Sequence, residues 1–194
     1  MNLHVLVTSK SLDKLVCSDN FTAEHSQRVA SLAECIGKAL GLNKNLIKDL
    51  AIAGLLHDIG KTALPKQLLY KPAALSVTEQ AQIHLHPIIG AKIAEVAGFE
   101  AHIVSAINGH HERLDGSGYP LGLQGIEIDL LTRIISIVDV YAAMTSERPY
   151  RKALTTAIAL EELSDVNRYD QQVVAVLKRV ITQPEFAAMG QASQ

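Results

Sequence analysis

The sequence has little that would cross-link it, anchor it in a membrane or hold it along a nucleic acid. Its two cysteines, Cys17 and Cys35, are too few for a disulfide framework and form no CxxC motif, which favours a reducing compartment. The N-terminus lacks a basic segment followed by a full apolar stretch, and no apolar run is long enough to span a membrane. Lys and Arg total 18 against 20 Asp and Glu, without a long basic run. We therefore expect a cytoplasmic protein that partners neither a membrane nor long nucleic acids.

Aromatic side chains are also scarce. They make up 4% of the residues, with no Trp, whereas apolar residues make up 48%, so a core must be built from Leu, Ile, Val and Ala. Such a core favours helices packed on helices. The length of 194 residues fits one domain. We expect a leading segment over 1–20, a helical domain over 21–183 and a flexible tail over 184–194.

Apolar residues recur at helical spacing along most of the chain. The predicted helices are Thr22 to Leu40, Asn43 to the His57-Asp58 pair, Ser76 toward His86, Ile88 to Ala97, Ala101 to Asn108, Leu130 to Thr145, and two peripheral amphipathic helices between Ala153 and Ile181. Ser76 and Glu79 have the form of a capping box, and Pro87 either breaks that helix or starts the next one. The glycine-rich stretch from Gly109 to Gly125 predicts a loop.

Asp139 lies in the middle of a segment, LLTRIISIVDVYAAMT, that is apolar almost all round. An ionised carboxylate in such a helix is costly unless it is paired or bound to a metal. Arg133 is six residues away and points elsewhere on a helix, so a distant residue or an ion must supply the partner. The alternatives are that Asp139 caps another helix or pairs with an arginine.

Several histidines occupy comparable positions on inward stripes, at helix ends or beside the loop. One inward histidine alone is more often a hydrogen-bonded core residue than a metal ligand. Together they form a candidate ligand set of His25, His57, Asp58, His86, His110, His111 and Asp139.

Seven ligands are too many for one tetrahedral zinc ion but suit two octahedral ions bridged by Asp58, with positions left for a hydroxide and for substrate oxygens. Imidazole and carboxylate ligands without a thiolate favour iron or manganese, with zinc, nickel and cobalt as further candidates. Two-metal sites serve phosphoester hydrolysis, because they activate a water and neutralise phosphate charge. Lys61 is placed to add a positive group for the phosphate, or is a solvated lysine at a helix C-terminus.

Five segments resemble the signature of the HD-GYP family, in order and over most of the chain. They are HSQRVA (25–30), HDIGK (57–61), HPIIG (86–90), HHERLDGSGYP (110–120), and Asp139 followed by RPYR (148–151). The resemblance implies an all-α HD-domain helical bundle around a binuclear metal site formed by the seven residues. It also implies hydrolysis of cyclic di-GMP to pGpG or GMP, with Asp58 and Lys61 in catalysis.

The resemblance further implies that Lys61, Arg148 and Arg151 contact phosphates or guanine of the substrate, although surface ion pairs are the alternative for the arginines. The loop has a structural interpretation of its own, since Gly116 and Gly118 permit unusual backbone angles and Tyr119-Pro120 fixes the exit of the turn. We assign Tyr119 no catalytic role. The family resemblance also points to diguanylate cyclase (GGDEF) domains as partners of this loop.

Two positions differ from, or vary within, the family pattern. Ala142 stands where the family often has a second aspartate, three residues after Asp139, which makes full activity less certain. Phe21 stands where members with a third metal carry a glutamate, so two metals are expected. The alternatives to a cyclic di-GMP phosphodiesterase are a hydrolase of another cyclic dinucleotide, such as cyclic GMP-AMP, and a catalytically weak cyclic di-GMP-binding regulatory module.

Overall fold

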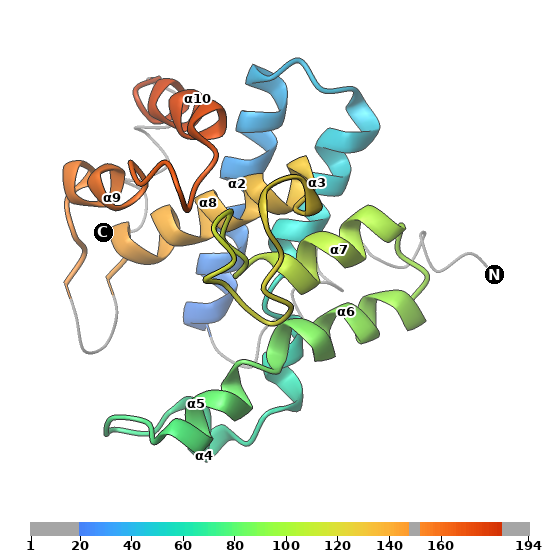
Figure 1. The fold of residues 1–194 in the computed structure, drawn as a ribbon, viewed down its shortest axis with the longest axis vertical. Helices are drawn as coiled ribbons and strands as arrows, with labels where there is room; N and C mark the ends of the chain where they lie inside the picture. Colours follow the sequence, from blue (N-terminus) through green and yellow to red (C-terminus); the bar gives the residue numbers. More distant parts are fainter. Residues whose placement is uncertain (1–19, 148–151, 184–194) are drawn as a thin grey trace.

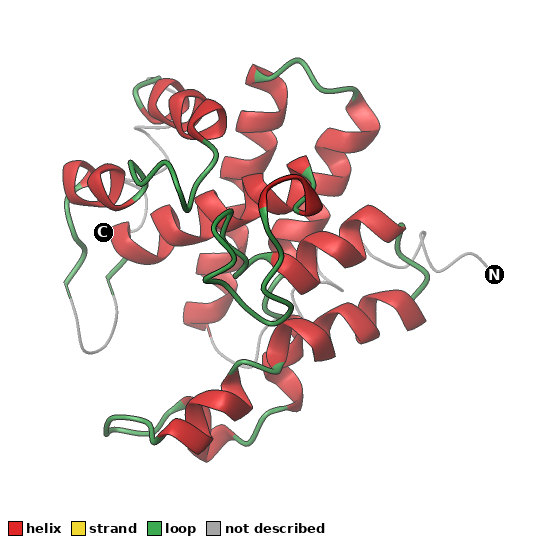
Figure 2. Ribbon diagram, in the orientation of Figure 1, coloured by secondary structure: helices red, strands yellow, loops and turns green. Residues whose placement is uncertain are grey.

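The computed structural model describes residues 20–147 and 152–183, which form helices and loops without a strand (Figures 1 and 2). The helices are α2 (Asn20–Ala39), α3 (Lys44–Leu56), α4 (Lys66–Leu69), α5 (Val77–Ile83), α6 (His86–Val96), α7 (Ala101–Gly109), α8 (Leu130–Thr145), α9 (Thr156–Glu162) and α10 (Gln171–Ile181), with 3-10 turns η2 (Ile59–Ala63) and η3 (Gly125–Glu127). The all-α prediction is confirmed. The expected leading segment, apart from Asn20, and the tail over 184–194 lie outside the described residues.

Helix α8 crosses the middle of the molecule, and helices α2, α3, α7, α9 and α10 pack against it (Figure 1). It begins where Asp129 accepts a hydrogen bond from the amide of Thr132 at 2.8 Å. Ten of its 16 residues are buried, which confirms the prediction of a central buried helix over 130–145. This position places Asp139 inside the protein rather than on a surface.

Helix α3 ends earlier than its apolar pattern predicts. It stops at Leu56 with His57 as its C-terminal cap, and Asp58 precedes the 3-10 turn η2. Within this turn, Gly60 meets the start of α6 backbone to backbone. A β-carbon at position 60 would overlap the carbonyl oxygen of His86 and lie 2.6 Å from the nitrogen of Gly90. The His-Asp pair is therefore at a helix end, as predicted, and is held directly against α6.

The α4 and α5 pair projects from the body of the fold (Figure 1), and α5 has no buried residue. Its start follows the predicted capping box. Ser76 accepts from the Glu79 amide at 3.2 Å, and the Glu79 carboxylate accepts from the Ser76 amide at 2.8 Å. Pro87 lies in the first turn of α6, so it starts a new helix.

Both helices expected after position 153 are present. Helix α10 packs on α2 and α8 and buries Val173, Val174, Val176, Leu177 and Val180, so it belongs to the core and is not only a peripheral cover. None of the described helices combines the length and the apolar character needed to cross a membrane.

Candidate metal centre

The fold brings the seven predicted ligand residues together from distant parts of the chain. His25 comes from α2, His57 and Asp58 from the end of α3, His86 from the start of α6, His110 and His111 from the end of α7, and Asp139 from the middle of α8. All are buried except His111, which is half-buried. A cluster of this kind is what the sequence predicts, and its geometry decides what it can bind.

The ligand atoms form two groups that share Asp58. One group contains Asp58, His86, His110 and His111, and the other contains His25, His57 and Asp58; within each, the atoms lie within 4.8 Å of one another. Asp58 Oδ2 lies 3.4 Å from His57 Nε2, whereas Oδ1 lies 3.2 Å from His86 Nε2. Each carboxylate oxygen thus faces one group, which is the arrangement of a bridging ligand.

Asp139 finds its partners inside this cluster. Its Oδ1 lies 3.0 Å from His25 Nε2 and 3.7 Å from His57 Nε2, and its Oδ2 lies 3.9 Å from His111 Nδ1. Arg133 instead pairs with Asp170 at 2.9 Å. Of the two expected kinds of partner, a distant residue or an ion, the structure shows distant residues, and neither alternative for this aspartate applies.

Three histidines share one device that fixes their tautomer. In each, Nδ1 lies 2.7 Å from the carbonyl oxygen three residues earlier: His57 with Gly54, His86 with Ile83, and His110 with Ile107. A carbonyl only accepts hydrogen bonds, so each Nδ1 carries the proton and each Nε2 presents a lone pair. Imidazoles prepared in this way are suited to bind a metal through Nε2.

Buried atoms in the cluster lack hydrogen-bond partners. His57 Nε2 and Asp58 Oδ1 are buried without one. An acceptor left unpaired inside a protein is costly, and a cation removes that cost. Nitrogen and oxygen donors without sulfur also match a divalent transition metal. The residues present therefore fit a metal centre.

The charge states of Asp58, His110 and His111 favour metal binding as well, whereas against the effect of burial the Asp58 and Asp139 carboxylates raise the pKa of His57. Burial opposes ionisation of Asp58, but the positive charge of Lys61 holds the pKa of its carboxyl well below the usual range. Burial and the neighbouring His111 hold the pKa of His110 well below its usual value. Burial also lowers the pKa of His111 to about 3, against the opposing effect of Asp139. Near neutral pH the carboxylate is ionised and both imidazoles are neutral, the forms that bind metals.

Lys61 reaches the same site from η2. Its Nζ lies 2.6 Å from Asp58 Oδ2, and about a third of its side chain is exposed. Lys61 is therefore an ion-pair partner of Asp58 at the solvent edge and not a freely solvated lysine. Arg148 and Arg151 lie outside the described residues.

Sequence reasoning missed Glu112, which organises the loop after α7. Only 2% of Glu112 is exposed. Its Oε1 accepts from the amides of Leu121 (2.6 Å) and Gly122 (3.2 Å), and its Oε2 accepts from that of Leu123 (3.1 Å). The available signal was a carboxylate in a glycine-rich stretch. The pattern does not indicate that the later part of the loop folds back so that its amides surround this carboxylate.

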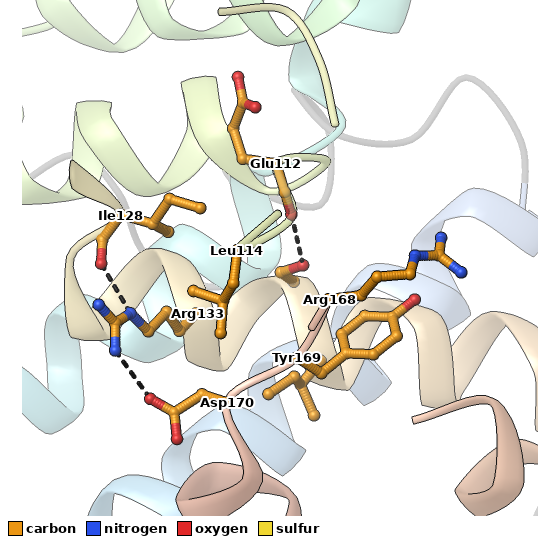
Figure 3. Close-up of a pocket in the computed structure, with 9 residues that line it drawn as sticks. Glu112, Leu114, Ile128, Arg133, Arg168, Tyr169 and Asp170 are labelled. Atoms are coloured by element: carbon orange, nitrogen blue, oxygen red, sulfur yellow. Dashed lines mark hydrogen bonds and ion pairs between the residues drawn. The ribbon is translucent and has the colours of Figure 1, made fainter. Parts of the chain in front are cut away.

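The loop is also tied to the C-terminal part of the domain. The guanidinium of Arg113 donates to Ser136 Oγ at 2.7 Å and lies over the ring of Tyr169. Figure 3 shows the small cavity beneath this junction, between the loop, α8 and the segment that leads into α10. Its volume of about 10 Å³ admits no more than a water molecule, and none of the seven clustered residues lines it. The cavity is a packing feature and not a nucleotide site.

Comparisons with known proteins identify the family of the chain. Residues 10–173 match the family model described as HD domain. The chain is 41% identical over 166 residues to 3′3′-cGAMP-specific phosphodiesterase 1 of Vibrio cholerae, which covers 82% of this chain and 38% of the relative. It is 38% identical over 173 residues to cyclic di-GMP phosphodiesterase PA4108 of Pseudomonas aeruginosa, which covers 88% of this chain and 42% of the relative. The chain thus spans less than half the length of these two curated relatives.

A solved structure supports the fold. The HDG"Y"P protein Bd1817 from Bdellovibrio bacteriovorus superposes with a TM-score of 0.69 at 21% identity, over 93% of this chain and 60% of that one. The family model, the relatives and the motif order agree, so the chain belongs to the HD-domain family and, within it, to the HD-GYP group.

Proposed function

We propose that this chain is a metal-dependent phosphodiesterase that hydrolyses cyclic di-GMP to pGpG or GMP. The observation that carries the proposal is the division of the buried ligand atoms into two groups that share Asp58. A two-metal hydrolase needs two adjacent cation positions joined by a bridging group. Relatives named as cyclic di-GMP phosphodiesterases support the substrate.

We assign the ligands of the two ions according to these groups. His25, His57, Asp58 and Asp139 would hold one ion, and Asp58, His86, His110 and His111 would hold the other. The imidazole and carboxylate donors favour iron or manganese over zinc, nickel or cobalt. When bound, such ions lower the pKa of a water and neutralise charge on a phosphate.

The protein's own residues prepare the site for an anionic substrate. Asp58 holds its carboxylate between the two groups, and backbone carbonyls keep the lone pairs of three imidazoles directed inward. Lys61 brings a positive charge to the rim, where a phosphate would approach. We propose that Arg148 and Arg151, known here only from the RPYR motif, add contacts to phosphate or guanine.

A second substrate has support of its own. The relative that shares 41% identity is named as specific for 3′3′-cGAMP, and another such enzyme shares 36%. Metal ligands determine phosphoester chemistry but do not read the base. Cyclic GMP-AMP is therefore the alternative substrate. A GGDEF domain as a partner of the glycine-rich loop rests on the family resemblance alone.

The alternative from another class is a cyclic di-GMP-binding module with weak turnover. It is favoured by Ala142, which lies one turn after Asp139 and is fully buried in the apolar core. At that position no carboxylate is available to orient a ligand, and losing such a group commonly lowers activity by about 10- to 100-fold.

The decisive experiment is anaerobic purification, metal analysis, and incubation with cyclic di-GMP and cyclic GMP-AMP in parallel. We expect two ions per chain and release of linear product, faster from cyclic di-GMP. Faster release from cyclic GMP-AMP would favour the second substrate. Binding without product over hours by fully metal-loaded protein would reject the enzyme in favour of the module. Asp58→Asn serves as the inactive control.

A further inference from the structure

His111 is oriented differently from the other histidines of the two groups. His57, His86 and His110 each donate from Nδ1 to a backbone carbonyl. Among the described residues, no backbone carbonyl accepts such a bond from His111, which is also the most exposed of the seven clustered residues. Another contact must therefore fix the plane of its ring.

Aromatic rings supply that contact. The ring of His110, itself one of the clustered residues, lies 4.0 Å from the His111 ring with 44° between their planes. From outside the cluster, the Tyr119 ring lies 4.6 Å from the His111 ring with 30° between their planes. The His84 ring lies 3.9 Å from the Tyr119 ring with 11° between the planes. Two imidazoles at these distances would overlap on one face of a phenol ring, so they occupy opposite faces. The result is a column of three rings, His84, Tyr119 and His111, that runs from the end of α5 to the metal centre.

The middle ring is held in place by the loop that carries it. The Tyr119 amide donates to the His111 carbonyl at 3.3 Å. A β-carbon on Gly118 would overlap the backbone of Glu112, so the loop lies directly on the chain after His111. Gly118 is thus required for this close approach and not for a positive φ, whereas Gly116 does have a φ of 80°. The part of the loop that follows Tyr119 is held by Glu112, whose carboxylate accepts three hydrogen bonds from backbone amides.

We propose that Tyr119 is a positioning residue for His111, and that His84 supports Tyr119 from its other face. The inference rests on the proposed function, in which His111 binds one of two ions. It gives Tyr119 no contact with reacting atoms. His111 belongs to only one group of ligands. Loss of the ring column should therefore weaken the binding of one ion and leave the binding of the other unchanged.

The test is a calorimetric titration of metal-free protein with Mn²⁺. Wild type must first show two binding events, because failure at this step rejects the binuclear site itself and is separate from the inference about Tyr119. Tyr119→Leu is expected to weaken one event by about 10- to 100-fold and to leave the other in place, as for other groups that orient a ligand. Tyr119→Phe keeps the ring and should retain both affinities.

Substitutions at His84 test the column from outside the loop. His84→Ala should weaken the same event as Tyr119→Leu, and His84→Phe should restore it. Thermal unfolding of the metal-free variants checks for general damage, which would weaken both events together. Equal weakening of both events, or no change in either, would overturn the inference. If Tyr119→Leu does not fold, the two His84 variants test the inference by themselves. Unchanged metal binding by His84→Ala would then reject the ring column.

Discussion

The Nε2 atoms of His86 and His110 face each other at 3.2 Å, although each ring already donates its Nδ1 proton to a backbone carbonyl. A hydrogen bond between the two Nε2 atoms would require one ring to be an imidazolium cation. Burial and nearby imidazoles hold the pKa of His110 well below its usual value, so His110 does not supply that charge. If His86 and His110 held a metal ion, its charge would take the place of that proton.

The first prediction is that removal of the metal lowers the stability of the folded protein. Each ion that binds only the folded state should stabilise it by about 2.7 kcal/mol when free metal exceeds its dissociation constant 100-fold, so two ions should contribute about twice that. For a domain of this size the free energy from each ion raises the melting temperature by roughly 5–10 °C. Thermal unfolding with chelator and then with Mn²⁺ measures the shift. Asp58→Asn should show almost no shift, and an equal shift in this variant would place the ions elsewhere.

Asp58→Asn should remove both ions, because Asp58 alone belongs to both ligand groups. His25→Gln and His111→Gln each alter one group and should each reduce the metal content toward one ion per chain. Elemental analysis after dialysis measures these contents. Asp49→Asn is the matched control, since Asp49 also pairs with a histidine, His102 at 2.8 Å, but lies outside the cluster. An Asp58→Asn protein that retains one ion would show that the carboxylate does not bridge.

Glu112→Ala should destabilise the protein strongly. The substitution leaves three amides of the loop without their buried carboxylate. Hydrogen bonds to charged groups contribute about 1.5–3 kcal/mol each, so a loss of about 3 kcal/mol in the free energy of unfolding is a conservative expectation. Denaturant unfolding of the metal-free protein measures it. Glu127→Ala, which removes an exposed bond to the Gln124 amide, should cost less than about 1 kcal/mol. If both variants lost similar free energies of unfolding, Glu112 would not be the residue that organises the loop.

The start of α5 should depend on pH through Glu79. Hydrogen bonds from Lys71 and Ser76 lower the pKa of Glu79 from 4.5 to about 2. Because the folded pKa is the lower one, the stabilisation is present above 4.5 and is lost as the pH falls through about 2. Glu79→Gln should therefore speed hydrogen exchange of the α5 amides at pH 7. The ratio of its exchange rate to that of wild type should begin to fall below pH 4.5 and approach one only as the pH falls through about 2. A ratio independent of pH would exclude this cap as the cause.

Much of the fold could be predicted because its signals are local. The bounds of α8 agree with the apolar segment from Leu130 to Thr145, and Asn43 and Ser76 cap helices as their side-chain chemistry predicts. The convergence of the seven ligand residues was also predictable, since polar side chains in apolar surroundings imply a shared partner. The end of α3 was placed too late because the change from the α-helix to the 3-10 turn η2 has no local pattern in the sequence.

The parts of the site that escaped prediction depend on contacts across the fold. Glu112 and Tyr119 act through a loop that returns on itself, and His84 reaches that loop from a separate helix. Neither spacing nor composition identifies such pairings, since a loop has no repeat that assigns side chains to a face. The ion pair between Lys61 and Asp58 likewise depends on the 3-10 turn that follows α3.

The backbone contact at Gly60 has a consequence for the dimensions of the metal centre. The turn that carries Asp58 and the helix that begins at His86 touch main chain to main chain, with no side chain between them. This close approach of the two backbones allows Asp58 Oδ1 to lie 3.2 Å from His86 Nε2. A methyl group at position 60 would act as a wedge that moves the shared carboxylate away from one ion position. The absence of a β-carbon at Gly60 thus allows the two halves of the centre to lie close enough to share the Asp58 carboxylate.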